Sequence, residues 1–193
     1  MIVLNAPLSE SDVRSLRLGD IVFLNGDIFT ARDRAHARII ASDFDDIPIE
    51  RGSVIFHCGP LVRRVGSSWL IISAGPTTSE RMNATAPVVI EKLRIRAIIG
   101  KGGMGASVRD AMRRCGCVYL AMTGGAGVLA AIRASVKNVY WTDLGLAEAV
   151  WHLHVEDFGP LVVSIDANGA SLYDEVLKKA RASFSQKRGS SCP

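Results

Sequence analysis

The hydrophobic positions of this chain fall into short apolar runs separated by glycine, proline and asparagine, a pattern typical of a protein with many short strands. Between residues 52 and 73 the runs are especially short and turns separate them, which predicts an antiparallel meander. The predicted strands of the first half are residues 21–24, 53–57, 61–65 and 69–72.

In the second half, strand patterns alternate with helix patterns. Residues 97–99 lead through a glycine-rich turn into a predicted helix at 108–115, and residues 117–122 lead through a second such turn into a helix at 128–134. Further strands are predicted at 136–141 and 161–165, and helices at 146–150 and 171–184. Runs of this kind predict an α/β protein with mixed sheets and flanking helices.

Two helix starts carry charged residues. Residues 30–40 place Ala31, Ala35 and Ile39 at helical spacing, with Thr30 as the predicted N-cap, after a turn at Asn25-Gly26. The segment GPTTSERM at 75–82 follows a predicted strand, so Thr77 or Thr78 is expected to cap a second helix, which Pro87 should interrupt.

Length and composition limit the class of protein. A chain of 193 residues with 48% hydrophobic and 22% charged residues is typical of one soluble globular domain. We assign residues 1–184 to that domain and expect a disordered tail at 185–193. No apolar run approaches the ~20 residues that span a bilayer, and the N-terminus has no basic leader, so a cytoplasmic location is predicted.

Charge and cysteine spacing exclude several kinds of site. The net charge of +4 is mild and the basic residues are dispersed, which favours a small anionic ligand over nucleic acid. The four cysteines have neither zinc-finger nor ferredoxin spacing, so no metal site is predicted. His152 and His154 share a strand face, but zinc would require a third ligand.

Three segments place cations beside groups that bind anions. Arg32 and Arg81 lie near helix starts, where backbone N–H groups are free, and Lys101 is followed by glycines such as Gly102, whose amides can form an anion-binding nest. Thr77 adds a hydroxyl. The alternatives are a helix cap at 77–81, a solvated basic helix that Asp33 partly neutralises, and a plain turn at 100–105.

The segments TARDRAH at 30–36, GPTTSERM at 75–82 and IGKGGM at 99–104 together resemble the C-terminal half, or separate β subunit, of class I iron-sulfur fumarate hydratases and L-tartrate dehydratases. YWTDLG at 140–145 and VEDFGP at 155–160 extend the resemblance, which covers residues 8–184. It implies a swivelling β/β/α three-layer domain, a more specific fold than the pattern alone predicts.

The resemblance also implies a divided active site. A partner α subunit would hold a [4Fe-4S] cluster, and the two chains would form an α2β2 hetero-oligomer. This chain would contribute Thr77 and Lys101 to catalysis, and Arg32, Arg81 and Lys101 to dicarboxylate binding, with Asp33, His36 and Gly102 in possible supporting positions. Glu80 departs from the small residues expected there, and its charge would repel a dianion if it faced the site.

Three functions follow as hypotheses. The first is the β subunit of a hydro-lyase that converts fumarate reversibly to L-malate, because fixed cations stabilise both the dicarboxylate and the charge that develops on proton removal. The second is the β subunit of L-tartrate dehydratase. The third is a non-catalytic anion-binding or assembly module.

Overall fold

The computed structural model describes residues 1–189, and residues 190–193 lie outside the described part. Its centre is a closed ring of five strands, in which each strand pairs with its two neighbours. In ring order the strands are β2 (Ile21–Thr30), β3 (Val54–Phe56), β6 (Ala97–Gly100), β7 (Val118–Ala121) and β9 (Val150–Ile165).

The first four strands of this ring run parallel, and β9 closes it by pairing antiparallel with both β7 and β2. Two strands extend the sheet beyond the ring: β1 (Ile2–Asn5) lies parallel to β2, and β8 (Ala134–Tyr140) lies antiparallel to β9. Because β2, β3, β6 and β7 are parallel, their carboxyl ends lie at one end of the ring.

Both faces of β3 and β6, and most of β7, are buried, which explains their continuously apolar sequences. In β3, Val54 and Phe56 point into one hydrophobic core, whereas Ile55 points into a second core on the other face. The same alternation holds in β6, where Ile99 and Ile98 belong to different cores. The first core fills the ring, and the second lies between the ring and its covering helices.

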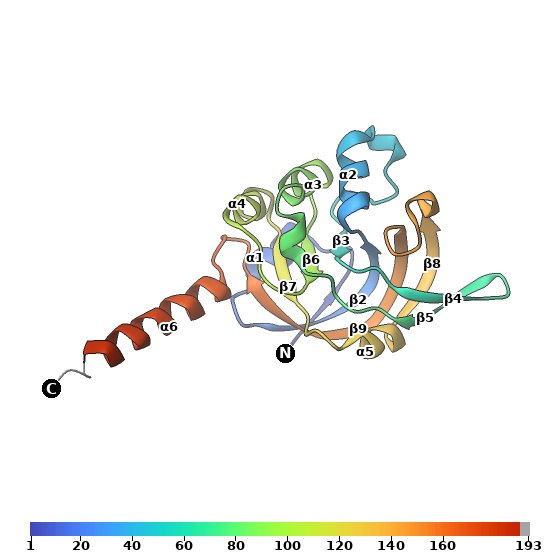
Figure 1. Ribbon diagram of the computed structural model, residues 1–193. Helices are drawn as coiled ribbons and strands as arrows, with labels where there is room; N and C mark the ends of the chain where they lie inside the picture. The colour runs from blue at the N-terminus through green and yellow to red at the C-terminus, as the bar shows by residue number, and fades with distance from the viewer. Residues whose placement is uncertain (190–193) are drawn as a thin grey trace.

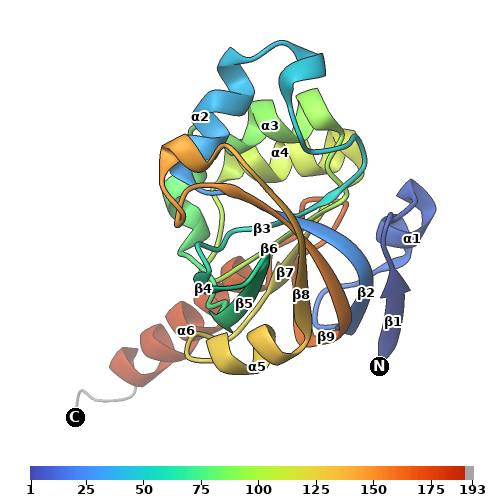
Figure 2. The same cartoon turned by 90° about the vertical axis from the view of Figure 1, so that its right-hand side faces the viewer.

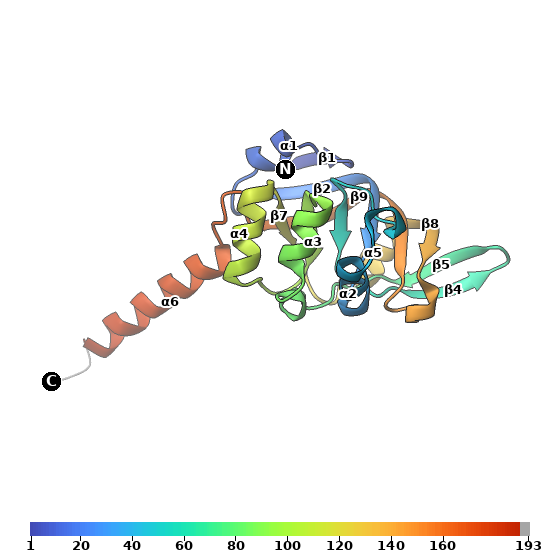
Figure 3. The same cartoon turned by 90° about the horizontal axis from the view of Figure 1, so that it is seen from above.

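Helices α2 (Asp33–Ala41), α3 (Ala86–Leu93) and α4 (Ala106–Cys115) lie side by side over one side of the strands, as Figures 1 and 3 show. The short helix α5 (Gly127–Ile132) lies on the opposite side (Figure 2). Helix α1 (Glu10–Ser15) follows β1, and three 3-10 turns complete the set at Phe44–Asp46, Ser79–Met82 and Thr142–Leu144. No helix within residues 1–189 is both long and apolar enough to span a bilayer.

Two elements extend away from the body of the molecule (Figure 1). The hairpin of β4 (Leu61–Val65) and β5 (Ser68–Ser73) forms a separate two-stranded sheet, and α6 (Leu172–Gly189) extends in the opposite direction. The helix therefore continues past Phe184, its predicted end, into the stretch predicted to be disordered, while the last four residues of that predicted tail lie outside the described residues.

The mixed α/β architecture with flanking helices is as predicted, and so are both strand-turn-helix units of the second half. The prediction of an antiparallel meander over residues 52–73 is wrong in part. β4 and β5 pair antiparallel, but β3 pairs parallel with β2 and β6 and never with β4. A three-residue strand buried on both faces joins the central ring because only there are both faces covered.

Three further predictions are wrong. Asn25 and Gly26 do not form a turn, because β2 continues through them to Thr30 with register shifts, and Gly26 has a φ of +98° that suits a bulge. Residues 146–150 are not helical; the chain turns there before entering β9. Pro87 does not interrupt a helix but lies in the first turn of α3, where its missing N–H costs nothing.

Candidate active site

The predicted site residues lie where the chain leaves the carboxyl ends of β2, β3 and β6. Arg32 follows β2, and Lys101 follows β6. Residues 76–79 lie between the ends of β3 and β6, since Cys58 bridges to Pro76 on one side and Thr78 bridges to Lys101 on the other. The end of a parallel sheet is the usual place for a ligand in α/β proteins.

Thr77 is held by its backbone on both sides. Its N–H donates to the carbonyl of His57 at 2.6 Å, and its carbonyl accepts from the N–H of Lys101 at 3.4 Å. Among the described residues the Thr77 hydroxyl makes no side-chain hydrogen bond. It is therefore an available donor or acceptor beside a lysine, on a backbone segment that the ring strands fix.

Lys101 is a cation without a carboxylate partner in the part of the chain that the structure describes. Its aliphatic stem lies near Gly124, and Gly102 beside it has a φ of +74° and packs against the methyl group of Thr78. The positive φ shows why glycine is needed at this turn. The backbone of Lys101 thus lies beside that of Thr77, and its ammonium group has no carboxylate partner among the described residues.

Arg32 is the N-cap residue of α2, not a first-turn residue as predicted, and Thr30 is not the cap. The Thr30 hydroxyl instead accepts from the N–H of Trp151 at 3.0 Å, inside the ring. Arg32 Nε lies 3.4 Å from Glu148 Oε1, and the other Glu148 oxygen accepts from the N–H of Arg34 at 3.0 Å. One first-turn amide is therefore already occupied by a carboxylate.

Arg81 lies in the 3-10 turn Ser79–Met82 and contacts Asp33 at 2.5 Å, which joins this turn to the first residue of α2. Glu80 is exposed and does not pair with Arg81. Both arginines keep further N–H donors beyond those bound to Asp33 and Glu148, because a guanidinium carries five. An anion bound here would share or displace these carboxylates.

The N-cap expected at 77–78 is only partly correct. Thr78 occupies the N-cap position, but its side chain makes no capping hydrogen bond, and the element that follows is a 3-10 turn of four residues. Its first N–H, that of Ser79, donates to the carbonyl of Lys101 at 3.0 Å. The segment is therefore fixed by its contacts with β3 and β6 more than by a side-chain cap.

Two fully buried histidines lie behind the candidate site. His36, predicted as a supporting residue, and His57 pack edge to face with ring centroids 5.1 Å apart. Burial lowers the pKa of His36 to about 4, although Asp33 opposes the shift, and burial followed by the neighbouring His36 lowers the pKa of His57 well below its usual value. Both imidazoles are therefore neutral at physiological pH.

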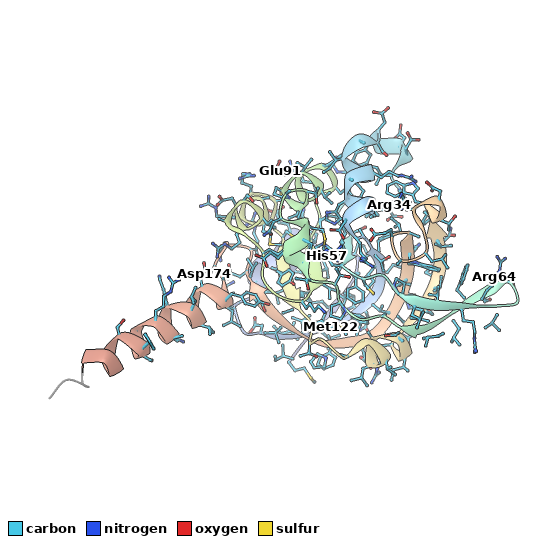
Figure 4. The ribbon with its side chains drawn as sticks, viewed as in Figure 1. Arg34, His57, Arg64, Glu91, Met122 and Asp174 are labelled. Atoms are coloured by element: carbon cyan, nitrogen blue, oxygen red, sulfur yellow. The ribbon has the colours of Figure 1, made fainter. Side chains whose placement is uncertain are left out.

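The second of these histidines was not predicted from the sequence. Figure 4 shows His57 in the interior of the molecule, between α3 and the strands, whereas Arg64 lies far out on the hairpin. His57 Nδ1 lies 2.8 Å from Ser79 Oγ, which also accepts from the Tyr119 hydroxyl at 2.9 Å. Glu148 was missed as well. Neither His57 nor Glu148 carries a local sequence signal of a role at the site.

The histidines and cysteines of the described residues are engaged in other ways than metal ligation. Among the described residues no group of three or more histidine, cysteine, aspartate or glutamate side chains is placed to hold a metal ion. Burial raises the pKa of the Cys58 thiol to about 12 and that of Cys117 further, so both stay protonated and do not fit as cluster ligands. His152 and His154 instead both contact Asp27, at 3.2 and 2.7 Å.

The fold and the site define an α/β domain that presents three cations and a free hydroxyl at the carboxyl ends of parallel strands, an arrangement suited to a small anion. The family model described as "Fumarase C-terminus" matches residues 1–176. The chain belongs to this family.

Named relatives agree with this assignment. The chain is 47% identical over 177 residues to the putative L(+)-tartrate dehydratase subunit beta of Methanocaldococcus jannaschii, and the aligned residues cover 89% of this chain and 91% of that protein. It is 38% identical over 178 residues to the L(+)-tartrate dehydratase subunit beta of Escherichia coli, and this alignment covers 91% of this chain and 88% of that protein. A putative class I fumarate hydratase of Geobacillus stearothermophilus is 38% identical over 189 residues, which are 96% of this chain but 36% of that protein.

Proposed function

We propose that this chain is the β subunit of a two-subunit hydro-lyase that hydrates fumarate reversibly to L-malate. The observation that supports the proposal is that the segments carrying Arg32, Thr77, Arg81 and Lys101 lie at the carboxyl ends of β2, β3 and β6, in a chain of the Fumarase C-terminus family. L-Tartrate is the second candidate substrate, because two of the relatives described above are named as tartrate dehydratase β subunits.

The three cations would bind the two carboxylates of the substrate. Each charge-assisted hydrogen bond contributes about 1.5 to 3 kcal/mol, and the arginines can bind in bidentate fashion. Lys101, which has no carboxylate partner among the described residues, can bind the substrate without releasing one first. Arg32 and Arg81 would bind the substrate carboxylates while they remain paired with Glu148 and Asp33. These pairs hold the two guanidinium groups in place before substrate arrives.

Thr77 would hold or move the proton at the carbon next to a carboxylate. Removing that proton places a second negative charge on the carboxylate, which the fixed cations stabilise more strongly than they stabilise the ground state. A threonine hydroxyl is a weak base, so the charge of Lys101 beside it would favour the alkoxide. The same lysine would then serve both proton transfer and substrate binding.

A [4Fe-4S] cluster held by a separate α subunit would supply the Lewis acid that binds the hydroxyl group being added or removed. Since no group of residues within 1–189 fits the cluster, we assign it to the partner, and activity should require both chains. The relatives from Methanocaldococcus jannaschii and Escherichia coli support this division, because both are named as β subunits.

The test is anaerobic co-expression with the cluster-bearing subunit, followed by an assay of fumarate consumption from its ultraviolet absorbance. We expect turnover by the complex and none by either chain alone, with kcat/KM for fumarate above that for L-tartrate. A cluster-loaded complex that turns over neither substrate would refute the hydro-lyase proposal, and a higher kcat/KM for L-tartrate would transfer it to tartrate dehydration. Binding of a dicarboxylate by this chain alone, without turnover in the complex, would favour the third hypothesis, a non-catalytic module.

A further inference from the structure

Ser79 is the point at which three parts of the fold meet. Its hydroxyl accepts from Tyr119 of β7 at 2.9 Å and lies 2.8 Å from Nδ1 of His57, which follows β3. Its N–H donates to the carbonyl of Lys101, after β6, at 3.0 Å. Ser79 and His57 are fully buried, so water does not compete for these bonds.

The protons of this network can be assigned from the donors available. The Tyr119 phenol donates to Ser79, so the single proton of the Ser79 hydroxyl is free to go to His57 Nδ1. This requires a neutral imidazole that carries its proton on Nε2, and burial lowers the pKa of His57 accordingly. Both hydroxyl protons are then used, and the buried Nε2–H of His57 is left without a partner among the described residues. The other tautomer would leave two groups unpaired, the Ser79 proton and the Nε2 lone pair of His57.

The same residues hold Thr77. The carbonyl of His57 accepts from the Thr77 N–H, and the N–H of Lys101 donates to the Thr77 carbonyl. His57 and Lys101 therefore bind Thr77 through the backbone, and the same two residues bind Ser79, two positions further on. Gly100 shows how closely Ser79 is packed, because a Cβ at Gly100 would overlap the Ser79 hydroxyl.

We propose that Tyr119, Ser79 and His57 form a positioning network that fixes the Thr77 hydroxyl relative to Lys101. None of the three is placed to touch the substrate; they act through the segment that carries Thr77. The inference rests on the proposed function, in which Thr77 moves a proton. A misplacement of about 1 Å at such a group costs on the order of 100-fold in rate.

The test compares Ser79→Ala with Ser164→Ala in the complex with the cluster-bearing subunit. Ser164 is a matched control because it is also a buried serine but lies in β9, where its hydroxyl donates to the carbonyl of Val162. We expect Ser79→Ala to lower kcat at least tenfold with KM changed less than threefold, because the cations remain in place. Tyr119→Phe, which removes one hydroxyl and no carbon, should also lower kcat, but by a smaller factor than Ser79→Ala.

A second measurement, independent of turnover, is amide hydrogen exchange of the full chain. Ser79→Ala should accelerate exchange at residues 77–79 at least tenfold, and Ser164→Ala should leave these amides unchanged. Nitrogen NMR of wild-type His57 should show the proton on Nε2. The inference would be overturned if Ser79→Ala left amide exchange at residues 77–79 unchanged, or if it raised KM without lowering kcat. An inactive wild-type complex would refute the proposed function alone, since the exchange result still decides whether the network holds residues 77–79.

Discussion

Mild acid should destabilise this chain through its two buried histidines. His36 and His57 have no exposed surface, and the pKa of His36 is lowered to about 4. In the unfolded chain both imidazoles titrate near the usual value of about 6.5. Between these values the unfolded state binds protons that the folded state does not, so the free energy of unfolding falls as the pH falls.

The size of the effect follows from the unfolded state. At about pH 5.5, one unit below the unfolded pKa, each histidine contributes a loss of about 1.4 kcal/mol while it remains neutral in the folded state. The two together should lower the free energy of unfolding by about 3 kcal/mol relative to about pH 7.5. The loss should continue towards pH 4, where His36 begins to accept its proton in the folded chain.

Urea unfolding of the full chain at a series of pH values is the assay. Asp27, whose pKa is lowered to about 2 by Lys137 and two histidines although burial opposes the shift, titrates below this range. The variants His36→Gln and His57→Gln should each remove about half of the pH dependence between 7.5 and 5.5. The reasoning is refuted if wild-type stability is flat across this range, or if neither substitution changes the slope.

Three substitutions test the site and its packing. Arg81→Lys should raise KM and lower kcat, with kcat/KM reduced roughly 10- to 100-fold by loss of bidentate geometry, while Tm changes little because the Asp33 pair is partly exposed. Thr77→Val should lower kcat on the order of 100-fold or more with KM nearly unchanged, since the shape is kept and the hydroxyl is lost. Gly100→Ala should lower the free energy of unfolding by about 1 to 3 kcal/mol in urea unfolding, because the added methyl overlaps Ser79.

The first substitution has a matched control, and each of the three has an outcome that would contradict its prediction. Arg51→Lys, at an exposed position stacked on Phe44, should leave the kinetics unchanged. Near-normal kinetics for Arg81→Lys would remove Arg81 from the site. Wild-type turnover by Thr77→Val would exclude its hydroxyl from proton transfer, and unaltered stability of Gly100→Ala would show that Ser79 can move aside.

The sequence predicts the two strand-turn-helix units of the second half because their strands are continuous apolar runs followed by glycine turns. Ile98 and Ile99 point to opposite faces, and both faces are buried, so the pattern reports burial directly. The extension of β2 could not be predicted in this way. Asn25 and Gly26 signal a turn locally, but pairing with β9 along the length of the strand absorbs them as an irregularity.

The candidate site shows the same limit. Arg32, Thr77, Arg81 and Lys101 were selected because they lie next to helix starts or glycines, and the structure does bring their segments together. The Glu148 partner of Arg32 lies more than 100 residues away in sequence, at a turn whose pattern predicted a helix. Contacts set by ring closure leave no trace in local periodicity, so this carboxylate could only be found in three dimensions.

The chemical state of the cysteines bears on how such an enzyme would survive oxidants. Cys58 and Cys117 are buried thiols that stay protonated, and the thiolate is the form that oxidants attack. The packing of the ring also depends on no metal ligand among the described residues. Under the proposed function, peroxide that destroys the partner's cluster should therefore leave Cys58, Cys117 and the fold around them intact. This subunit could then be used again once its partner has been rebuilt.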